Sequence, residues 1–258
     1  MLKVITTGKG GVGKTTTIST LATMMARDGR KVVVLDTDPS MNLAMTLGLP
    51  YLDVPTITEH KQEINEELDD MDEDPVLVGK RIMEEFSRVN ADGIRVIVMG
   101  AIPDEGNGCL CSAISIMKML LSYFDSDACP ESYDVAFVDS QAGPEILGRG
   151  LAKDFDCNLV LTEPTPKSAE VSRQVVVLSK NLGIEHNILI VNKADSDEDL
   201  LRISSLVGVP CEDSARIGFD RSVMDADREN VILLDAYPDC PSVKNIAAIR
   251  SRLERIVI

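Results

Sequence analysis

A glycine-rich segment near the amino terminus holds the residues that could bind a phosphate group. Residues 8–15 read Gly-Lys-Gly-Gly-Val-Gly-Lys-Thr and match the pattern G-x-x-x-x-G-K-S/T at every position. Glycines let the backbone N–H groups of such a loop converge on phosphate oxygens, and the helix that follows adds its positive end. We expect the ammonium of Lys14 to reach the β- and γ-phosphates of a nucleotide, and the hydroxyl of Thr15 to bind Mg²⁺. The residues predicted to bind the nucleotide here are Gly8, Lys9, Gly10, Gly11, Val12, Gly13, Lys14, Thr15 and Thr16.

Aspartates stand at the ends of two further apolar runs. Residues 31–35 lead to Asp36 and Asp38, and residues 134–138 lead to Asp139. Carboxylates at the carboxyl ends of parallel strands face the ligand crevice of an open α/β sheet. We therefore expect all three carboxylates to lie beside the glycine-rich loop.

Cys109 and Cys111 are separated by a single residue and follow a glycine-containing segment. Thiolates at positions i and i+2 of an extended segment project to the same side and can bind one soft or borderline metal ion. Two thiolates leave a tetrahedral ion half coordinated, so a two-fold dimer that joins two such pairs would supply four sulfurs. The alternative is that both are structural thiols in the core. A helix is predicted to begin at Ser112.

Strand and helix patterns alternate along the chain, which predicts a single α/β domain with a mostly parallel sheet and helices on both faces. Residues 50–92 interrupt the alternation with an acidic segment, which we expect to be a helical insertion. Nothing demands a second domain, so residues 1–258 are expected to form one. Strands are predicted at 2–7, 31–36, 94–99, 134–139, 157–162, 187–191 and 215–218, and helices at 14–28, 112–124, 144–153, 166–182, 196–206 and 242–257.

The composition argues against several classes of partner. A net charge of −16 and a pI near 4.5 oppose non-specific binding to nucleic acid, which requires a cationic face. No apolar run approaches the length of a membrane span. A strand begins at residue 2 and leaves no room for a signal peptide, so a cytoplasmic location with reduced cysteines is expected.

Lys9 places the loop in a narrower class. The segment Lys-Gly-Gly-Val-Gly-Lys-Thr resembles the deviant Walker A signature of the P-loop ATPases that include MinD, ParA and the nitrogenase iron protein. The resemblance implies an Mg²⁺-dependent ATPase in which Lys9 reaches across a homodimer to the partner's nucleotide. The implied catalytic residues are Lys9, Lys14 and Asp38, with Asp38 orienting the attacking water.

The same resemblance assigns the remaining aspartates and part of the base site. Asp36 and Asp139 would join Thr15 in the Mg²⁺ shell. Residues 139–143 look like the family's switch II, where Asp139 holds a Mg²⁺-bound water and Gly143 lets the loop respond to the γ-phosphate. Asn192, Lys193 and Glu163 match strand-end positions that contact the nucleotide base in relatives. Residues 216–220 look like a further adenine turn, but Gly218 replaces the family's proline and leaves that contact in doubt.

A second resemblance covers nearly the whole chain and is narrower. The chain is similar to the nickel-inserting ATPases of carbon monoxide dehydrogenase maturation, the CooC type. It implies that Cys109 and Cys111 of a homodimer bind Ni²⁺ or Zn²⁺ at the interface, and that apo carbon monoxide dehydrogenase is the client. The segments that carry the resemblance are residues 9–15, 38–39, 109–112, 139–143, 148–153, 163–164 and 192–193.

One alternative is an iron–sulfur ATPase like the nitrogenase iron protein, which also builds a four-cysteine site across a dimer. The second cysteine of that protein follows switch II, and residues 139–149 contain none here. Two Cys-x-Cys pairs could still hold a [4Fe–4S] cluster.

Another alternative is a positioning ATPase like MinD or ParA, which binds a membrane or DNA. Residues 242–257 form an amphipathic helix with apolar and basic faces, after a predicted N-cap at Pro241-Ser242. Such a helix could lie on an anionic membrane, but we expect it to pack against the sheet.

Overall fold

One twisted sheet organises the chain, and the computed structural model describes residues 1–38, 40–50, 53–60, 74–100, 110–143, 147 and 152–256. Within this part the sheet has eight strands in the order β3-β4-β2-β5-β1-β6-β7-β8. All neighbouring strands are parallel except β3, which runs antiparallel to β4 at the edge. The strands are β1 (Leu2–Gly8), β2 (Val32–Asp36), β3 (Ser87–Val89), β4 (Arg95–Val98), β5 (Val135–Asp139), β6 (Cys157–Thr162), β7 (His186–Ala194) and β8 (Ser214–Gly218).

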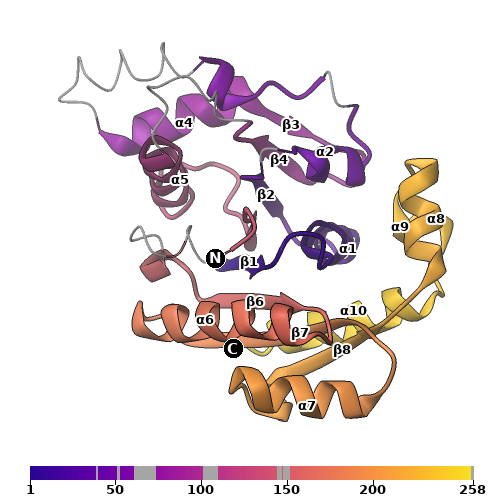
Figure 1. The fold of residues 1–258 in the computed structure, drawn as a ribbon. Helices are drawn as coiled ribbons and strands as arrows, with labels where there is room; N and C mark the ends of the chain where they lie inside the picture. The colour runs from indigo at the N-terminus through magenta and orange to yellow at the C-terminus, as the bar shows by residue number, and fades with distance from the viewer. Residues whose placement is uncertain are drawn as a thin grey trace.

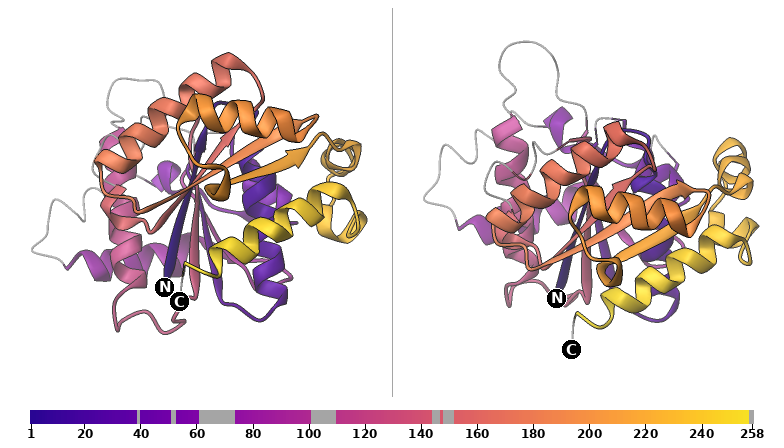
Figure 2. Two further views of the ribbon diagram at one scale, coloured as in Figure 1. Left: turned by 90° about the horizontal axis from the view of Figure 1, so that it is seen from below. Right: turned by 60° about the horizontal axis from the view of Figure 1, so that its bottom comes forward.

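Helices cover both faces of the sheet. The α-helices are α1 (Lys14–Arg27), α2 (Asn42–Thr46), α4 (Pro75–Phe86), α5 (Leu110–Phe124), α6 (Pro166–Asn181), α7 (Asp197–Val207), α8 (Arg221–Glu229), α9 (Leu233–Ala236) and α10 (Pro241–Leu253). Short 3-10 turns lie at η2 (Ile57–His60), η4 (Ala152–Asp154) and η5 (Cys211–Asp213). In Figure 1, α1 and α5 lie on opposite sides of β1 and β2. Figure 2 shows α10 on the side of the sheet opposite α6 and α7.

The strands are buried on both faces, as parallel sheets require. In β2, Val32 and Val34 pack with α1 and α10, whereas Val33 and Leu35 pack with α4 and α5 on the other face. Because alternate side chains point to opposite faces, a continuous run of apolar β-branched residues fills two cores at once. The predicted α/β class and mostly parallel sheet are confirmed.

The region predicted as a helical insertion is only partly helical. Residues 61–73, which hold most of the acidic run, lie outside the described part of the chain. Asp74 caps α4 by accepting a hydrogen bond from the Val76 amide at 3.0 Å. Ser87–Val89 forms strand β3, so the expectation of helix is wrong at that point: the three residues find an unpaired edge on β4, and tertiary pairing decides their conformation.

Other boundaries also differ from the prediction. Helix α5 begins at Leu110, two residues before the predicted start at Ser112, and α10 is capped at Cys240 with Pro241 in its first turn. The short helices α2, α8 and α9 were not predicted, because each is too short for a helical periodicity of apolar residues to be recognised. The predicted helix over 144–153 lies mostly outside the described residues, and its last two residues begin η4.

Candidate active site

The residues predicted to bind the nucleotide and Mg²⁺ lie at one edge of the sheet, where the carboxyl ends of six neighbouring strands meet. In spatial order these strands are β2, β5, β1, β6, β7 and β8. A pocket of about 810 Å³ opens at this edge. Its lining includes the glycine-rich loop and residues from β7, β8, α2 and α8: Gly10, Gly11, Gly13, Lys14, Thr15, Thr16, Asp38, Asn42, Met45, Asn192, Lys193, Ile217, Phe219, Asp220, Val223 and Met224.

The loop between β1 and α1 depends on glycine at two close approaches. Gly8 has φ 138°, and a Cβ atom there would lie 2.2 Å from the carbonyl oxygen of Leu161 on β6. Gly13 has φ 94°, and its Cβ would lie 2.3 Å from the side-chain nitrogen of Asn192. A side chain at Gly8 would push the loop away from the β6 backbone, and one at Gly13 would displace the Asn192 side chain; the positive φ disfavours any other residue at both positions.

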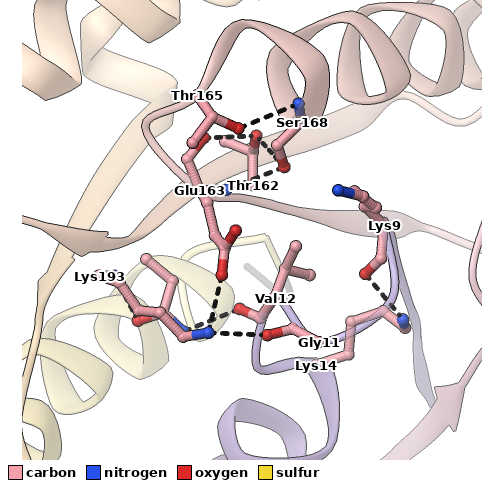
Figure 3. A network of polar contacts seen from close by, with 10 residues as sticks. Lys9, Gly11, Val12, Lys14, Thr162, Glu163, Thr165, Ser168 and Lys193 are labelled. Carbon is pink, nitrogen blue, oxygen red and sulfur yellow. Dashed lines mark hydrogen bonds and ion pairs between the residues drawn. The ribbon is translucent and has the colours of Figure 1, made fainter.

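Lys14 is a buried cation at the start of α1, with only 7% of its surface exposed. Its ammonium donates to the carbonyl oxygen of Lys9 at 3.4 Å. Burial lowers the pKa of Lys14, while the carboxylates of Asp139 and Asp38 oppose that shift. The Lys9 side chain is exposed, and its ammonium points away from that of Lys14 (Figure 3). The two lysines therefore present their charges in different directions.

Thr15 and Asp139 form the oxygen-rich part of the site. The Thr15 hydroxyl donates to one carboxylate oxygen of Asp139 at 2.6 Å, and the Thr6 hydroxyl donates to the other at 3.1 Å. Burial raises the pKa of Asp139, and the hydrogen bond from Thr15 and the charge of Lys14 oppose the rise. Thr6 was not predicted as a site residue, because a threonine within a strand gives no local signal of such a contact.

Asp36 is fully buried at the end of β2 and holds the segment that carries Asp38. Its carboxylate accepts hydrogen bonds from the backbone amides of Asp38 at 3.0 Å and Leu43 at 3.1 Å. Burial, with repulsion from Asp139, raises the pKa of Asp36 to about 8. Asp38 is half-buried and lines the pocket. The structure therefore brings all three predicted aspartates together beside the loop.

The segment predicted to act as switch II, residues 139–143, contacts the glycine-rich loop directly. The amide of Gly143 donates to the carbonyl oxygen of Gly8 at 3.1 Å. Gly143 has φ 99°, a left-handed conformation that favours glycine. The segment that begins at Asp139 thus ends in contact with the first residue of the glycine-rich loop.

The residues predicted to contact the base are engaged with the loop. The Asn192 amide nitrogen donates to the carbonyl oxygen of Val12 at 2.8 Å. The Lys193 ammonium donates to the carbonyl oxygen of Gly11 at 2.9 Å and pairs with Glu163 at 2.7 Å (Figure 3). Contact of these side chains with a base stays a prediction.

Apolar residues that were not predicted as site residues also line the pocket. Phe219 and Met224 line it although 61% and 53% of their surfaces are exposed. In the turn that departs from the family pattern, Asp220 caps α8 by accepting from the amide of Ser222 and also accepts from the amide of Ser242 on α10. The turn and α8 thus contribute apolar side chains to one wall of the pocket.

The Cys-x-Cys pair cannot be placed as fully. Cys109 lies outside the described residues, and only the backbone of Cys111 lies within them. Cys111 belongs to the first turn of α5, so the predicted extended conformation is wrong at that residue. In the part of the chain that is described, no group of three or more His, Cys, Asp or Glu side chains could hold a metal ion, and no helix is long and apolar enough to cross a membrane.

Known proteins resemble this chain in sequence and in fold. Residues 3–233 match the model of the CobQ/CobB/MinD/ParA nucleotide-binding domain. The chain is 28% identical to the carbon monoxide dehydrogenase accessory protein CooC of Rhodospirillum rubrum, over 99% of this chain and 97% of that protein. It is 32% identical to an ATP-binding protein of Methanocaldococcus jannaschii, over 78% and 79%. The cell division protein MinD of Aquifex aeolicus has a similar fold, with a TM-score of 0.70 and 21% identity over 98% of this chain and 97% of that one.

Proposed function

We propose that this chain, which belongs to the CobQ/CobB/MinD/ParA family of nucleotide-binding domains and is an ATPase, delivers a metal ion during carbon monoxide dehydrogenase maturation. It would act as a homodimer. The observation that carries this proposal is the similarity to CooC, which extends over 99% of this chain and 97% of that protein. The Cys-x-Cys pair supplies the chemistry, since thiolates bind soft and borderline metal ions.

Magnesium is the metal that the nucleotide site fits. The Thr15 hydroxyl and the Asp139 carboxylate offer adjacent oxygen atoms, the ligand type that Mg²⁺ prefers, and Asp36 lies beside them. When bound, Mg²⁺ neutralises charge on the phosphates of the nucleotide. Lys14 binds the same phosphates, and Asp38 orients the attacking water.

Two protomers would complete the site. The exposed ammonium of Lys9 points away from the Lys14 of its own chain, which suits contact with the nucleotide of a partner. Dimerisation would also bring together two pairs of Cys109 and Cys111, giving four thiolates for a cargo ion such as Ni²⁺ or Zn²⁺. Hydrolysis would loosen the dimer and release the ion to the apo-enzyme.

The competing proposal of a positioning ATPase draws on the structural likeness to MinD. The described apolar face of α10 is covered in the fold, however: Val243, Ile246, Ile249 and Leu253 are all buried. This face is therefore occupied by the protein's own core rather than displayed to a membrane.

Anaerobic equilibrium dialysis against Ni²⁺ tests the proposal. Wild type should bind about one ion per two chains, the number that a four-thiolate site between protomers requires. Binding should be lost in Cys109→Ala/Cys111→Ala and kept in the control Cys211→Ala, which removes an exposed thiol on η5. Nickel binding that survives in the double variant would rule out the proposed site. An absence of tight nickel in wild type would favour an iron–sulfur cluster or a positioning ATPase.

A further inference from the structure

Consecutive residues at the end of β7 hold consecutive carbonyl groups of the glycine-rich loop. Asn192 donates to the oxygen of Val12 at 2.8 Å, and Lys193 donates to the oxygen of Gly11 at 2.9 Å. Figure 3 shows the Lys193 ammonium between the Gly11 carbonyl and the carboxylate of Glu163. This arrangement joins β6, β7 and the loop.

The two contacts also fix the direction of the loop amides. In a trans peptide, the C=O of one residue and the N–H of the next point in opposite directions. Holding the Gly11 and Val12 oxygens toward β7 therefore turns the N–H groups of Val12 and Gly13 away from β7. A phosphate-binding loop needs its N–H groups turned to the ligand and its carbonyl oxygens turned away, because those oxygens repel a phosphate.

The residue that holds the Gly11 carbonyl, Lys193, has an unfavourable backbone conformation. Its φ is 57°, in the left-handed region that a lysine rarely occupies, and the β7–β8 pairing is irregular between Asn192 and Ala194. Such strain persists where the surroundings over-determine it and is common at functional sites. Here the Lys193 amide donates to the Asn192 side chain at 2.9 Å, and its ammonium pairs with Glu163 at 2.7 Å.

Glu163 is itself held in place. Its amide donates to the hydroxyl of Ser168 at 3.0 Å, in the first turn of α6. The Thr165 side chain caps the same helix by accepting from the Ser168 amide at 3.3 Å. The start of α6 therefore holds the backbone of Glu163, from which its carboxylate reaches the Lys193 ammonium.

We propose that Glu163 and Lys193 are positioning residues of the phosphate-binding loop: Glu163 holds the Lys193 ammonium on the Gly11 carbonyl, and this contact orients the loop amides toward the phosphates. The role differs from base recognition, which the sequence predicted for both residues. The positioning role requires only that the loop binds a nucleotide, so this proposal holds whether or not the protein delivers a metal ion.

Base contact, direct attraction of the phosphates and positioning of the loop predict different effects of substitution on ligand binding. A base contact would affect ADP but not inorganic pyrophosphate, which has no base. A direct electrostatic role of Lys193 on the phosphates would make loss of Glu163 tighten binding, since a nearby negative charge disappears. If the pair positions the loop, loss of either residue weakens ligand binding. Within each variant, the affinities for ADP and for pyrophosphate then fall by the same factor.

Isothermal titration calorimetry with Mg²⁺ and either ADP or inorganic pyrophosphate separates these roles. We expect Lys193→Met to weaken both ligands about tenfold and Glu163→Ala about three- to fivefold, with Lys193→Arg restoring most of the affinity because it keeps a charged donor. Glu170→Ala is the matched control, since it removes the same charge from an exposed ion pair with Arg173 on α6. Thermal unfolding of each variant confirms that it is folded.

Three results would overturn the proposal. Weaker ADP binding with unchanged pyrophosphate binding would assign the pair to the base. Tighter binding in Glu163→Ala would assign Lys193 to the phosphates. Unchanged affinity in both Glu163→Ala and Lys193→Met would mean that the loop holds its conformation without them.

Discussion

The hydroxyl of Thr15 donates to the carboxylate of Asp139 across 2.6 Å, a contact that joins the start of α1 to the end of β5. Lys14 precedes Thr15 in the chain, and its ammonium is attracted to the same carboxylate. A hydroxyl, an ammonium and a carboxylate thus converge at the junction of the glycine-rich loop and α1. Their convergence rests on the pairing of β1 with β5, in which Thr6 lies opposite Asp139.

Replacement of Lys14 by Met should remove hydrolysis without harming the fold. Loss of a preorganised charge at the transferred phosphoryl group lowers kcat by roughly 100-fold or more. Burial lowers the pKa of Lys14, which means that the folded protein disfavours this charge. The melting temperature of Lys14→Met should therefore not fall. Phosphate release and thermal unfolding measure the two effects, with the exposed Lys180→Met on α6 as control. Hydrolysis at the wild-type rate would contradict the assignment.

Alanine at Gly8 should destabilise the protein far more than alanine at Gly183. Both glycines have positive φ, at 138° and 92°, so both substitutions introduce backbone strain. A Cβ at Gly8 meets the Leu161 carbonyl at 2.2 Å, whereas a Cβ at Gly183 meets nothing within 4 Å. We expect a loss of about 1 kcal/mol for Gly183→Ala and about 3 kcal/mol for Gly8→Ala. Urea unfolding measures both, and equal losses would show that the close approach to β6 is relieved by a small shift.

The parts of the site that were predictable are those with a local cause. The loop motif consists of consecutive residues, so it can be recognised directly. Asp36 and Asp139 each end an apolar strand, and the carboxyl ends of parallel strands lie at the same edge of a sheet. Thr6 and Lys193 differ, because their partners Asp139 and Gly11 lie far away in the sequence. Spacing along the chain carries no information about such contacts. The wall made by α8 was missed for a related reason, since most of that helix is polar and exposed.

Cys157 should resist alkylation at pH values where an exposed thiol reacts. The thiolate is the reactive form, and burial in β6 with the nearby Asp156 charge raises the pKa of Cys157 to about 12. A raised pKa lowers the thiolate fraction, so Cys157 should stay unmodified by iodoacetamide at about pH 8 to 9. Cys211 is exposed and should be modified. Mass spectrometry of the labelled peptides measures both, and both should react in urea. Modification of Cys157 in the folded protein would mean that β6 opens readily.

Replacement of Lys9 by Ala should separate nucleotide binding from dimerisation. The Lys9 backbone oxygen accepts from Lys14, and Ala keeps that oxygen, whereas the exposed ammonium is lost. We expect wild-type affinity for ADP but no ATP-dependent dimer, because the charge is proposed to act on the nucleotide of the partner. Size-exclusion chromatography with light scattering, with and without ATP, measures the change. Lys153→Ala, which lies in η4, serves as control. A dimer that forms normally in Lys9→Ala would refute the role in trans.

Replacement of Ile249 by Ala should decide whether α10 packs in the core or binds a membrane. Ile249 is fully buried in the cluster that α10 shares with α1, β6 and β8. Loss of its side chain leaves a cavity, so the free energy of unfolding should fall by about 3 kcal/mol. Ser251→Ala, two residues along the same helix and exposed, should change it by less than about 0.5 kcal/mol. If α10 instead lay on a membrane, Ile249→Ala would leave stability unchanged and weaken binding to anionic vesicles. Urea unfolding and vesicle sedimentation with ATP, made on the same samples, distinguish the two cases.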